Sequence, residues 1–384
     1  MKKILLVEDA LDTRYILSMT LQKYGYEVIT AENGEQAWEI LQQQTDIQLV
    51  LSDWMMPLMD GVQLCKKIRN KQDWHCYIYF ILLTAKDDKD SLIQGMEAGA
   101  DDFLLKPVNI NELRVRLNAG NRIIQLEKTL ECSKQKVQQA YDQISLDLES
   151  AAKMQQALLP KPGRLGNIEF DWIFCPYRFV AGDMFNYFEL NDKYLGFYQL
   201  DVAGHGVSSA LLSFTVHHRI MNSLLLNNNI PIAPEEIVAA LNEEFQNSLD
   251  NYFTMIYGYI NKDSGEVCLT QAGHPKPIFV SGSNAKLYGE GGFPVGMLPD
   301  LEYQSFKLQL EIGDRFFIYS DGVTECMNSE NEQFSESRFM CLLEQYHDLS
   351  LDALLKKIDI ELRNWRKEVP FDDDVTLLAF ERMV

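Results

Sequence analysis

The stretch Leu49-Val50-Leu51-Ser52-Asp53 decides the fold of the first part of the chain, because it is a short apolar run that ends on an acid. Similar apolar runs lie at residues 4–7, 78–83 and 103–105, and stretches with helical spacing, such as 14–24 and 34–43, lie between them. Apolar runs that alternate with amphipathic helices are typical of a parallel sheet covered on both faces. We therefore predict a doubly wound α/β domain with a five-stranded parallel sheet, in which the runs at 49–53, 78–83 and 103–105 are the third, fourth and fifth strands.

Polar and charged residues stand at the ends of these apolar runs. They are Glu8, Asp9, Asp53, Thr84 and Lys106. Because function in an open parallel sheet lies at the carboxyl ends of the strands, we expect these side chains to converge on one edge. Crowded carboxylates favour a hard cation such as Mg²⁺. Asp53 could then attack phosphorus while Thr84 and Lys106 neutralise the phosphoryl oxygens. Each residue alone could also be a helix cap or a solvated side chain.

Residues 1–122 resemble a response-regulator receiver domain of the flavodoxin-like type. The matching motifs are Glu8-Asp9, the loop from Asp53 to Gly61, Thr84-Ala85, residues 98–103 and Lys106-Pro107. The resemblance implies that Asp53 is the phosphoacceptor. It also implies that Asp9, Asp53 and the Met55 carbonyl bind Mg²⁺, and that Glu8 acts through water. The residues that it assigns to the phosphorylation switch are Thr84, Phe103 and Lys106.

Residues 111–159 contain no proline and, after Gly120, no glycine. Apolar residues recur at every seventh position, at Ile123, Leu130, Val137, Ile144, Ala151 and Leu158. This pattern predicts one long helix whose seam pairs two copies of the chain as a coiled coil over residues 123–160. Ser133 and Asp147 interrupt the seam, so we expect pairing of modest strength. The alternative is a single amphipathic helix that lies on one of the domains.

Residues 161–384 follow a different pattern. Strand-like runs at 194–200, 254–260, 267–269 and 315–319 are interleaved with helical patterns at 208–226, 234–248 and 349–366. Asp263-Ser264-Gly265 is typical of a hairpin turn between two of these strands. Strands and helices without regular alternation favour an α+β fold, here a β-sandwich flanked by helices.

Aspartates next to apolar runs and glycines stand out in this second region. They are Asp183 after Ala181-Gly182, Asp201 at the start of Asp201-Val202-Ala203-Gly204-His205-Gly206, Asp321 before Gly322, and the block Asp372-Asp373-Asp374. A set of oxygen ligands alone favours two Mn²⁺ or Mg²⁺ ions over zinc, and two such ions make a phosphoester hydrolase in which a bridging water attacks phosphorus in line. Taken singly, each acid could instead be a turn or cap residue.

Residues 150–384 resemble the SpoIIE/RsbU-type branch of the PPM class of metal-dependent protein serine/threonine phosphatases. The matching motifs are Gln156-Ala157-Leu158-Leu159-Pro160, residues 178–183, 201–206, Ala272-Gly273-His274-Pro275, residues 320–325 and 373–376. The resemblance implies a binuclear metal centre whose ligands are Asp183, Asp201, Asp321, Asp373 and the Val202 carbonyl. Asp201 would bridge both ions, and Asp373 is chosen within its block because the family motif reads Asp-Asp-x-Thr.

Two positions depart from the family pattern. Ala181 replaces a usual glycine, and Asn186 replaces a second acid that is not a primary ligand, so we expect activity with weaker metal binding. Two further residues have open roles. His205 could donate a proton to the leaving serine oxygen or could stabilise its loop. Arg178 could bind the substrate phosphate through its guanidinium group or could be solvated.

Composition excludes several classes of partner. Lys and Arg number 35 and Asp and Glu 56, for a net charge of −21, so nothing general attracts the chain to nucleic acid or to an anionic membrane. No apolar stretch reaches about 18 residues, the length of a membrane span. Glu8 ends the basic and apolar start too early for a signal peptide. Seven scattered cysteines fit free thiols in a reducing compartment, so we expect a cytoplasmic protein.

Together the two resemblances imply a two-component output enzyme. A histidine kinase or histidine phosphotransfer protein would phosphorylate Asp53. The change would pass through the helix and control hydrolysis of phosphoserine or phosphothreonine on a partner protein, by family analogy a phosphorylated anti-sigma-factor antagonist. The alternative is a non-catalytic adaptor, with a degenerate phosphatase domain that binds a sigma-factor regulator. A degenerate domain should have lost aspartates, whereas all four are present.

Overall fold

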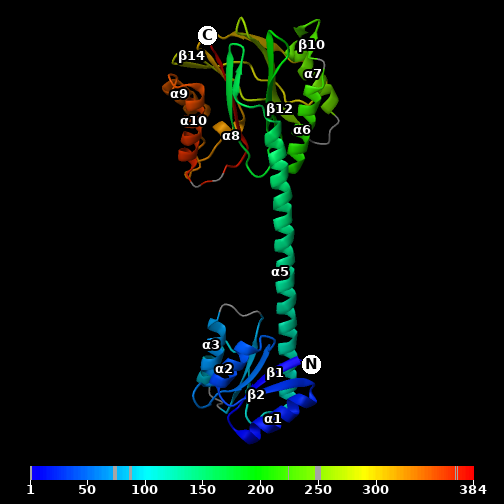
Figure 1. Ribbon diagram of the computed structural model, residues 1–384, viewed down its shortest axis with the longest axis vertical. Helices are drawn as coiled ribbons and strands as arrows, with labels where there is room; N and C mark the ends of the chain where they lie inside the picture. The colour runs from blue at the N-terminus through cyan, green and yellow to red at the C-terminus, as the bar shows by residue number, and fades with distance from the viewer. Residues whose placement is uncertain are drawn as a thin grey trace. The chain divides into compact units, whose positions relative to one another are not determined.

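The computed structural model describes residues 2–71, 76–85, 89–223, 225–246, 252–367, 369 and 371–384. Contacts divide the chain into two compact units, Met1–Asp142 and Gln143–Val384. The boundary falls inside helix α5 (Ile110–Leu158), which is drawn as one continuous helix in Figure 1.

The first unit is a parallel sheet with strand order β2-β1-β3-β4-β5. Its strands are β1 (Lys2–Val7), β2 (Tyr26–Ala31), β3 (Leu49–Asp53), β4 (Tyr79–Thr84) and β5 (Asp102–Leu105). Its helices are α1 (Leu11–Lys23), α2 (Gly34–Gln43), α3 (Gly61–Asn70), α4 (Lys89–Glu97) and the first part of α5. The predicted doubly wound fold with five parallel strands is confirmed.

Alternation along the strands explains why both faces of this sheet are covered. In β1, Leu5 and Val7 pack in a cluster with residues of α2 and α3, whereas Ile4 and Leu6 pack in a cluster with residues of α1 and α5. Every residue of β3 and β4 is buried, as expected for central strands of a doubly wound sheet.

Strand β2 was not among the apolar runs seen in the sequence. It lies at the edge of the sheet. Its end residues, Tyr26 and Ala31, are buried, and the residues between them, such as Glu27 and Thr30, are exposed or half-buried. An edge strand needs no continuous apolar run, so its pattern is weak.

Helix α5 agrees with the predicted long helix to within one residue at each end. Five of the six apolar side chains of its seven-residue repeat are exposed in the single chain, from 37% at Ile123 to 69% at Val137, and Ala151 is half-buried. An exposed apolar seam fits the predicted coiled coil, and pairing of two copies stays a prediction.

The second unit contains two antiparallel sheets that face each other. The β12 sheet has the order β16-β13-β12-β9-β8, and the β18 sheet has the order β15-β14-β17-β18-β7-β6. The β12 sheet consists of β8 (Met184–Glu189), β9 (Tyr194–Val202), β12 (Phe253–Asn261), β13 (Glu266–Ala272) and β16 (Ser305–Gln309). The β18 sheet consists of β6 (Gly163–Leu165), β7 (Ile168–Cys175), β14 (Ile278–Ser281), β15 (Asn284–Leu287), β17 (Arg315–Tyr319) and β18 (Val375–Arg382).

Helices flank this sandwich on both sides, as predicted. Helices α6 (Val207–Met221) and α7 (Pro234–Phe245) contact the β12 sheet, and α9 (Glu336–Gln345) and α10 (Leu351–Arg366) contact the β18 sheet. Aromatic rings fill the space between the sheets: Phe197 lies 6.0 Å from Phe316 and 5.2 Å from Phe380, measured between ring centroids. A short helix, α8 (Asp321–Thr324), follows β17.

Some predicted boundaries need correction. The helix predicted for 208–226 ends at Met221, because residues 226–231 instead form a small hairpin of β10 (Leu226–Asn227) and β11 (Ile230–Pro231). Asn228 and Asn229 at its turn have positive φ, which asparagine tolerates. The predicted end of the next helix, at Ser248, lies outside the described residues. The hairpin turn at Asp263-Ser264-Gly265 joins β12 and β13 as expected. Within the described part of the chain, no helix combines the length and the apolar character needed to cross a membrane.

Candidate functional site

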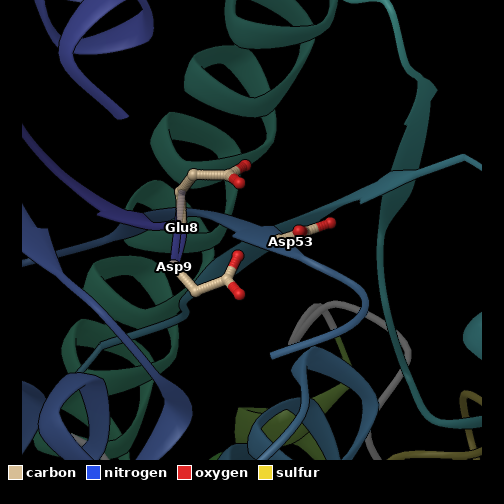
Figure 2. Close-up of side chains that lie close together, drawn as sticks. All are labelled: Glu8, Asp9 and Asp53. Atoms are coloured by element: carbon tan, nitrogen blue, oxygen red, sulfur yellow. The ribbon is translucent and has the colours of Figure 1, made fainter. Parts of the chain in front are cut away.

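The first candidate site lies at the carboxyl edge of the parallel sheet. Glu8 and Asp9 follow β1, and Asp53 ends the neighbouring strand β3. One oxygen of each carboxylate lies within 4.8 Å of the others, and Figure 2 shows the three side chains gathered at this edge. Three close carboxylate oxygens are a donor set that suits a hard cation such as Mg²⁺.

Lys106 completes this site from the end of β5. Its ammonium lies 2.7 Å from Glu8 Oε2 and 2.8 Å from Asp53 Oδ2. Burial is the main cause that raises the pKa of Glu8, and the charge of Asp53 adds to it. Burial alone would lower the pKa of Lys106, but hydrogen bonds and charges from Asp53 and Glu8 outweigh it, so the pKa is raised. Lys106 therefore stays protonated between the two carboxylates.

The turn after Asp53 depends on a glycine. A Cβ atom on Gly61 would lie 2.2 Å from the Asp53 carbonyl oxygen, so no side chain fits there. The Gly61 amide donates to the Trp54 carbonyl, and Asp60 forms a capping box with Gln63 at the start of α3. The loop between them, which includes the exposed Met55, is thereby held beside the acids.

The two remaining switch residues also lie near this edge. Thr84 is buried at the end of β4, and its carbonyl accepts a hydrogen bond from the Lys106 amide at 2.8 Å. Phe103 is half-buried in β5 and packs against the cluster on the α2 and α3 face. Glu8, Asp9, Asp53, Thr84 and Lys106 therefore lie at or just after the ends of strands of one sheet, whereas Phe103 lies within β5.

The second candidate site lies at one end of the sandwich. Asp183 precedes β8 and Asp201 lies in β9, both in the β12 sheet; Asp321 begins α8 after β17, and Asp373 precedes β18, both in the β18 sheet. Two hydrogen bonds connect the sheets here. Thr376 Oγ1 donates to Asp183 Oδ2 at 2.5 Å, and the Gly182 amide donates to an oxygen of the Asp372-Asp373-Asp374 block, Asp374 Oδ2, at 2.7 Å.

The electrostatics show that these acids, all of them among the described residues, act on one another, although no three of them bring carboxylate oxygens within 4.8 Å of one another as the receiver acids do. Burial, followed by the charges of Asp321 and Asp373, raises the pKa of Asp201 to about 7. Burial and the charge of Asp373 raise the pKa of Asp321 to about 6. Burial and the charge of Asp201 raise the pKa of Asp183 well above its ordinary value. The charge of a neighbouring acid thus contributes to each of these three shifts, as expected for carboxylates in one site.

This donor set fits divalent cations. Among the described residues, no Lys or Arg forms an ion pair with Asp183, Asp201, Asp321 or Asp373. The carboxylates repel one another and therefore favour a cation that would neutralise them. The Val202 carbonyl oxygen lies close to Gly182, the residue before Asp183, because a methyl group on Gly182 would lie 3.2 Å from it.

The structure separates the two candidates Asp373 and Asp374. Asp374 is buried and accepts hydrogen bonds from the Tyr177 amide and the Gly182 amide, both at 2.7 Å. Both of its carboxylate oxygens are therefore hydrogen-bonded to backbone amides. Asp373 is exposed, and its charge acts on Asp201 and Asp321. This difference favours Asp373 as the ligand within the block.

His205 and Arg178 are both exposed and lie around one aromatic ring. The His205 ring contacts the Tyr177 ring at 5.7 Å, and the Arg178 guanidinium lies 5.1 Å from the same ring. The Tyr177 amide bonds to Asp374, so this group borders the acids. The sequence alone gave no reason to single out Tyr177, since a lone tyrosine after a strand has no distinguishing pattern.

The family departures are accommodated locally. Ala181 is fully buried, and Asn186 points its amide at the sulfur of Met221 at 3.5 Å. His274, in the motif Ala272-Gly273-His274-Pro275, is buried and its Nδ1 hydrogen-bonds with Thr254 Oγ1 at 2.8 Å. Burial lowers its pKa to about 3, so the ring is neutral.

Comparison with known proteins identifies both units. The profile of the family described as Stage II sporulation protein E (SpoIIE) matches residues 191–383, half of the chain, and that of the response regulator receiver domain matches residues 4–118. The class is therefore a receiver domain fused to a SpoIIE/RsbU-type PPM phosphatase domain. The chain belongs to the SpoIIE family.

Relatives and solved structures agree with this assignment. The chain is 28% identical over 231 residues to "Phosphoserine phosphatase RsbP" of Bacillus subtilis, covering 59% of this chain and 56% of the relative. It is 42% identical over 118 residues to "Probable transcriptional regulator ycf27" of Cyanophora paradoxa, covering 31% of this chain and 47% of the relative. The chain spans about half the length of the curated relatives it matches.

One solved structure supports the fold of the second unit. It is the SiaA-PP2C domain of Pseudomonas aeruginosa, with a TM-score of 0.55 and 20% identity over 63% of this chain and 98% of that chain. At this identity the likeness concerns the fold alone.

Proposed function

We propose that this chain is a response regulator in which phosphorylation of Asp53 controls a metal-dependent protein serine/threonine phosphatase. The receiver would comprise residues 1–122, the linker helix 123–160 and the phosphatase 161–384. The observation that carries the proposal is the raised pKa of Asp183, Asp201 and Asp321, to which the charges of neighbouring acids, including Asp373, contribute, in a chain of the SpoIIE family.

In the receiver, the Asp53 carboxylate would attack the phosphoryl group offered by a histidine kinase or histidine phosphotransfer protein. Asp9, Asp53 and the Met55 carbonyl would hold Mg²⁺, with Glu8 acting through water; the ion, when bound, offsets the charge of the phosphoryl oxygens. Lys106, already protonated beside Asp53, would bind one phosphoryl oxygen, and the Thr84 hydroxyl would bind another.

In the phosphatase, Asp183, Asp201, Asp321, Asp373 and the Val202 carbonyl would hold two Mn²⁺ or Mg²⁺ ions, with Asp201 between them. When bound, the ions supply an activated water and polarise the phosphoryl group. Arg178 would bind the substrate phosphate, and His205 would donate a proton from its imidazole to the departing serine oxygen. Their shared contact with Tyr177 supports a common place at the mouth of the site.

The substrate would be phosphoserine or phosphothreonine on a partner protein, and by family analogy a phosphorylated anti-sigma-factor antagonist. Similarity to a phosphoserine phosphatase of Bacillus subtilis supports the first part of this proposal. The exposed seam of α5, including Val137 and Ile144, supports a homodimer formed through the linker. Phosphorylation would move Thr84 and Phe103 and change the packing of α5, and we expect activation.

The test measures turnover of a phosphoserine protein by the purified chain. Wild type and Asp53→Asn are each assayed with and without acetyl phosphate, in Mn²⁺ and in EDTA. We expect turnover that requires Mn²⁺, and stimulation by acetyl phosphate in the wild type only. Equal turnover in all four protein and phosphodonor combinations would contradict control by Asp53. Absence of turnover under every condition, with the metals bound, would favour the adaptor alternative.

A further inference from the structure

A single buried glutamine stands out on the last turns of α5. The side chain of Gln155 is 1% exposed, whereas its neighbours Met154, Gln156 and Ala157 are exposed. A buried amide requires hydrogen-bond partners, since leaving a buried polar group unpaired destabilises the fold. The hydrogen-bond partners of Gln155 therefore indicate its role.

These partners lie on the segment that carries a candidate metal ligand. Gln155 Oε1 accepts a hydrogen bond from the Ala181 amide at 2.9 Å, and Nε2 donates to the Ala181 carbonyl at 2.9 Å. A longer hydrogen bond of 3.5 Å runs from Nε2 to the carbonyl of Asp183. The side-chain amide thus pairs with both backbone groups of Ala181, as a neighbouring strand would.

The segment is held from two sides. From the other side, the carboxylate of Asp374 accepts the Gly182 amide at 2.7 Å. Among the described residues, the hydrogen bonds of the Ala181 amide and carbonyl both go to Gln155. Gln155 is therefore the contact that fixes the residue two positions before Asp183.

The end of α5 is itself firmly attached to the sandwich. Leu159 is buried in the main core cluster, and Trp172 Nε1 donates to the Pro160 carbonyl at 2.8 Å. The Tyr187 hydroxyl donates to the Lys161 carbonyl. A shift or rotation of the preceding helical turn relative to this anchor is therefore transmitted to the Ala181 backbone through Gln155.

We propose that Gln155 is a positioning residue for Asp183, and that it makes the last turns of α5 part of the divalent-metal site. The inference rests on the proposed phosphatase function and names the contact through which α5 would regulate it. Loss of the Gln155 hydrogen bonds would free the Asp183 backbone and weaken Mn²⁺ binding, while substrate contacts stay in place.

The test compares Gln155→Met with Gln156→Met, the same substitution one residue further along the helix at an exposed position. Both are made in the full chain with Asp9→Asn, which removes one carboxylate ligand from the proposed metal site of the receiver in every protein alike. Calorimetry measures the dissociation constant for Mn²⁺. Two lost hydrogen bonds predict about tenfold or more weaker binding for Gln155→Met, and no change for Gln156→Met.

Kinetics and amide exchange separate positioning from general damage. We expect kcat of Gln155→Met to recover at saturating Mn²⁺, with KM for the phosphoprotein unchanged. The Ala181 amide should exchange faster, whereas the Leu200 amide in β9 should not. Faster exchange at both amides, or an unchanged Mn²⁺ constant, would overturn the inference. If Gln155→Met does not fold, Gln155→Asn, which keeps the amide but shortens its reach, should show the same weakening in smaller measure.

The Mn²⁺ constant does not depend on turnover, so the two proposals fail separately. A wild type that binds Mn²⁺ but hydrolyses no phosphoserine would refute the phosphatase, and the comparison of the two variants would still decide the role of Gln155. An active wild type with equal Mn²⁺ binding in both variants would refute the role of Gln155 alone.

Discussion

Replacing Asp201 with asparagine should abolish phosphatase activity and, with divalent cations removed, stabilise the protein at neutral pH. The reason is the cost of ionising a carboxylate buried among other acids, which raises the pKa of Asp201 to about 7. A carboxyl whose pKa is higher in the folded than in the unfolded protein binds more protons when folded. Its contribution to stability therefore falls as pH rises between about 4 and 7.

The expected gain in the free energy of unfolding follows from the size of the pKa change of Asp201. Raising the pKa from 3.8 to about 7 corresponds to about 4 kcal/mol of ionisation cost above pH 7. Asp201 keeps some access to solvent and a hydrogen bond with Asp183, so one substitution should recover only about half, or about 2 kcal/mol. In a unit of this size about 2 kcal/mol raises the melting temperature by about 4–8 °C.

Thermal unfolding in EDTA at pH 5 and pH 8 is the assay. Asp201→Asn should melt higher than wild type at pH 8, and by a clearly smaller margin at pH 5, where only about a third of the stability loss between pH 4 and 7 has occurred. Mn²⁺ at pH 8 should stabilise wild type and not the variant. Asp192→Asn, at an exposed turn between β8 and β9, changes the net charge equally and should have no such effect. A gain that is the same at both pH values, or hydrolysis at the wild-type rate, would refute the reasoning.

Three further predictions concern the linker and both sites. Val137→Asp combined with Ile144→Asp should convert a dimer to a monomer in sedimentation, and a wild type that is monomeric at high micromolar concentration would contradict the coiled coil. Lys106→Met should tighten Mg²⁺ binding severalfold in calorimetry, because the ammonium no longer competes for the carboxylates, while phosphorylation of Asp53 by acetyl phosphate slows at least tenfold. Gly322→Ala should destabilise the second unit by about 1–3 kcal/mol in urea unfolding, since its Cβ would lie 2.1 Å from a carbonyl oxygen.

The sequence was most informative for the receiver, and the reason is geometric. Consecutive strands of a parallel sheet run in one direction, so an acid at the end of each apolar run must arrive at the same edge. Glu8, Asp53 and Lys106 could therefore be grouped from spacing alone, and their ion pairs followed. The edge strand β2 was not predicted as an apolar run, because polar residues are interspersed among its apolar ones.

In the phosphatase, the sequence gave the aspartates but not what surrounds them. An antiparallel sandwich brings together strand ends that are distant in sequence, as in the hydrogen bond from Thr376 to Asp183. Asp373 and Asp374 differ because only the carboxylate of Asp374 accepts hydrogen bonds from the backbone amides of Tyr177 and Gly182, and spacing along the chain does not predict this. Gln155 had no signal at all, because one glutamine in a glutamine-rich helix differs from its neighbours only by being buried.

The energies involved indicate how small a change could control this site. A tenfold shift between active and inactive populations requires about 1.4 kcal/mol. One or two buried hydrogen bonds, at about 1 kcal/mol each, have the same size. The repulsion among the acids would make metal binding sensitive to the position of Asp183, and Gln155 hydrogen-bonds to the backbone of Ala181, two residues before it. Control by phosphorylation would then need a change of packing in one helix, and no rearrangement of the sandwich.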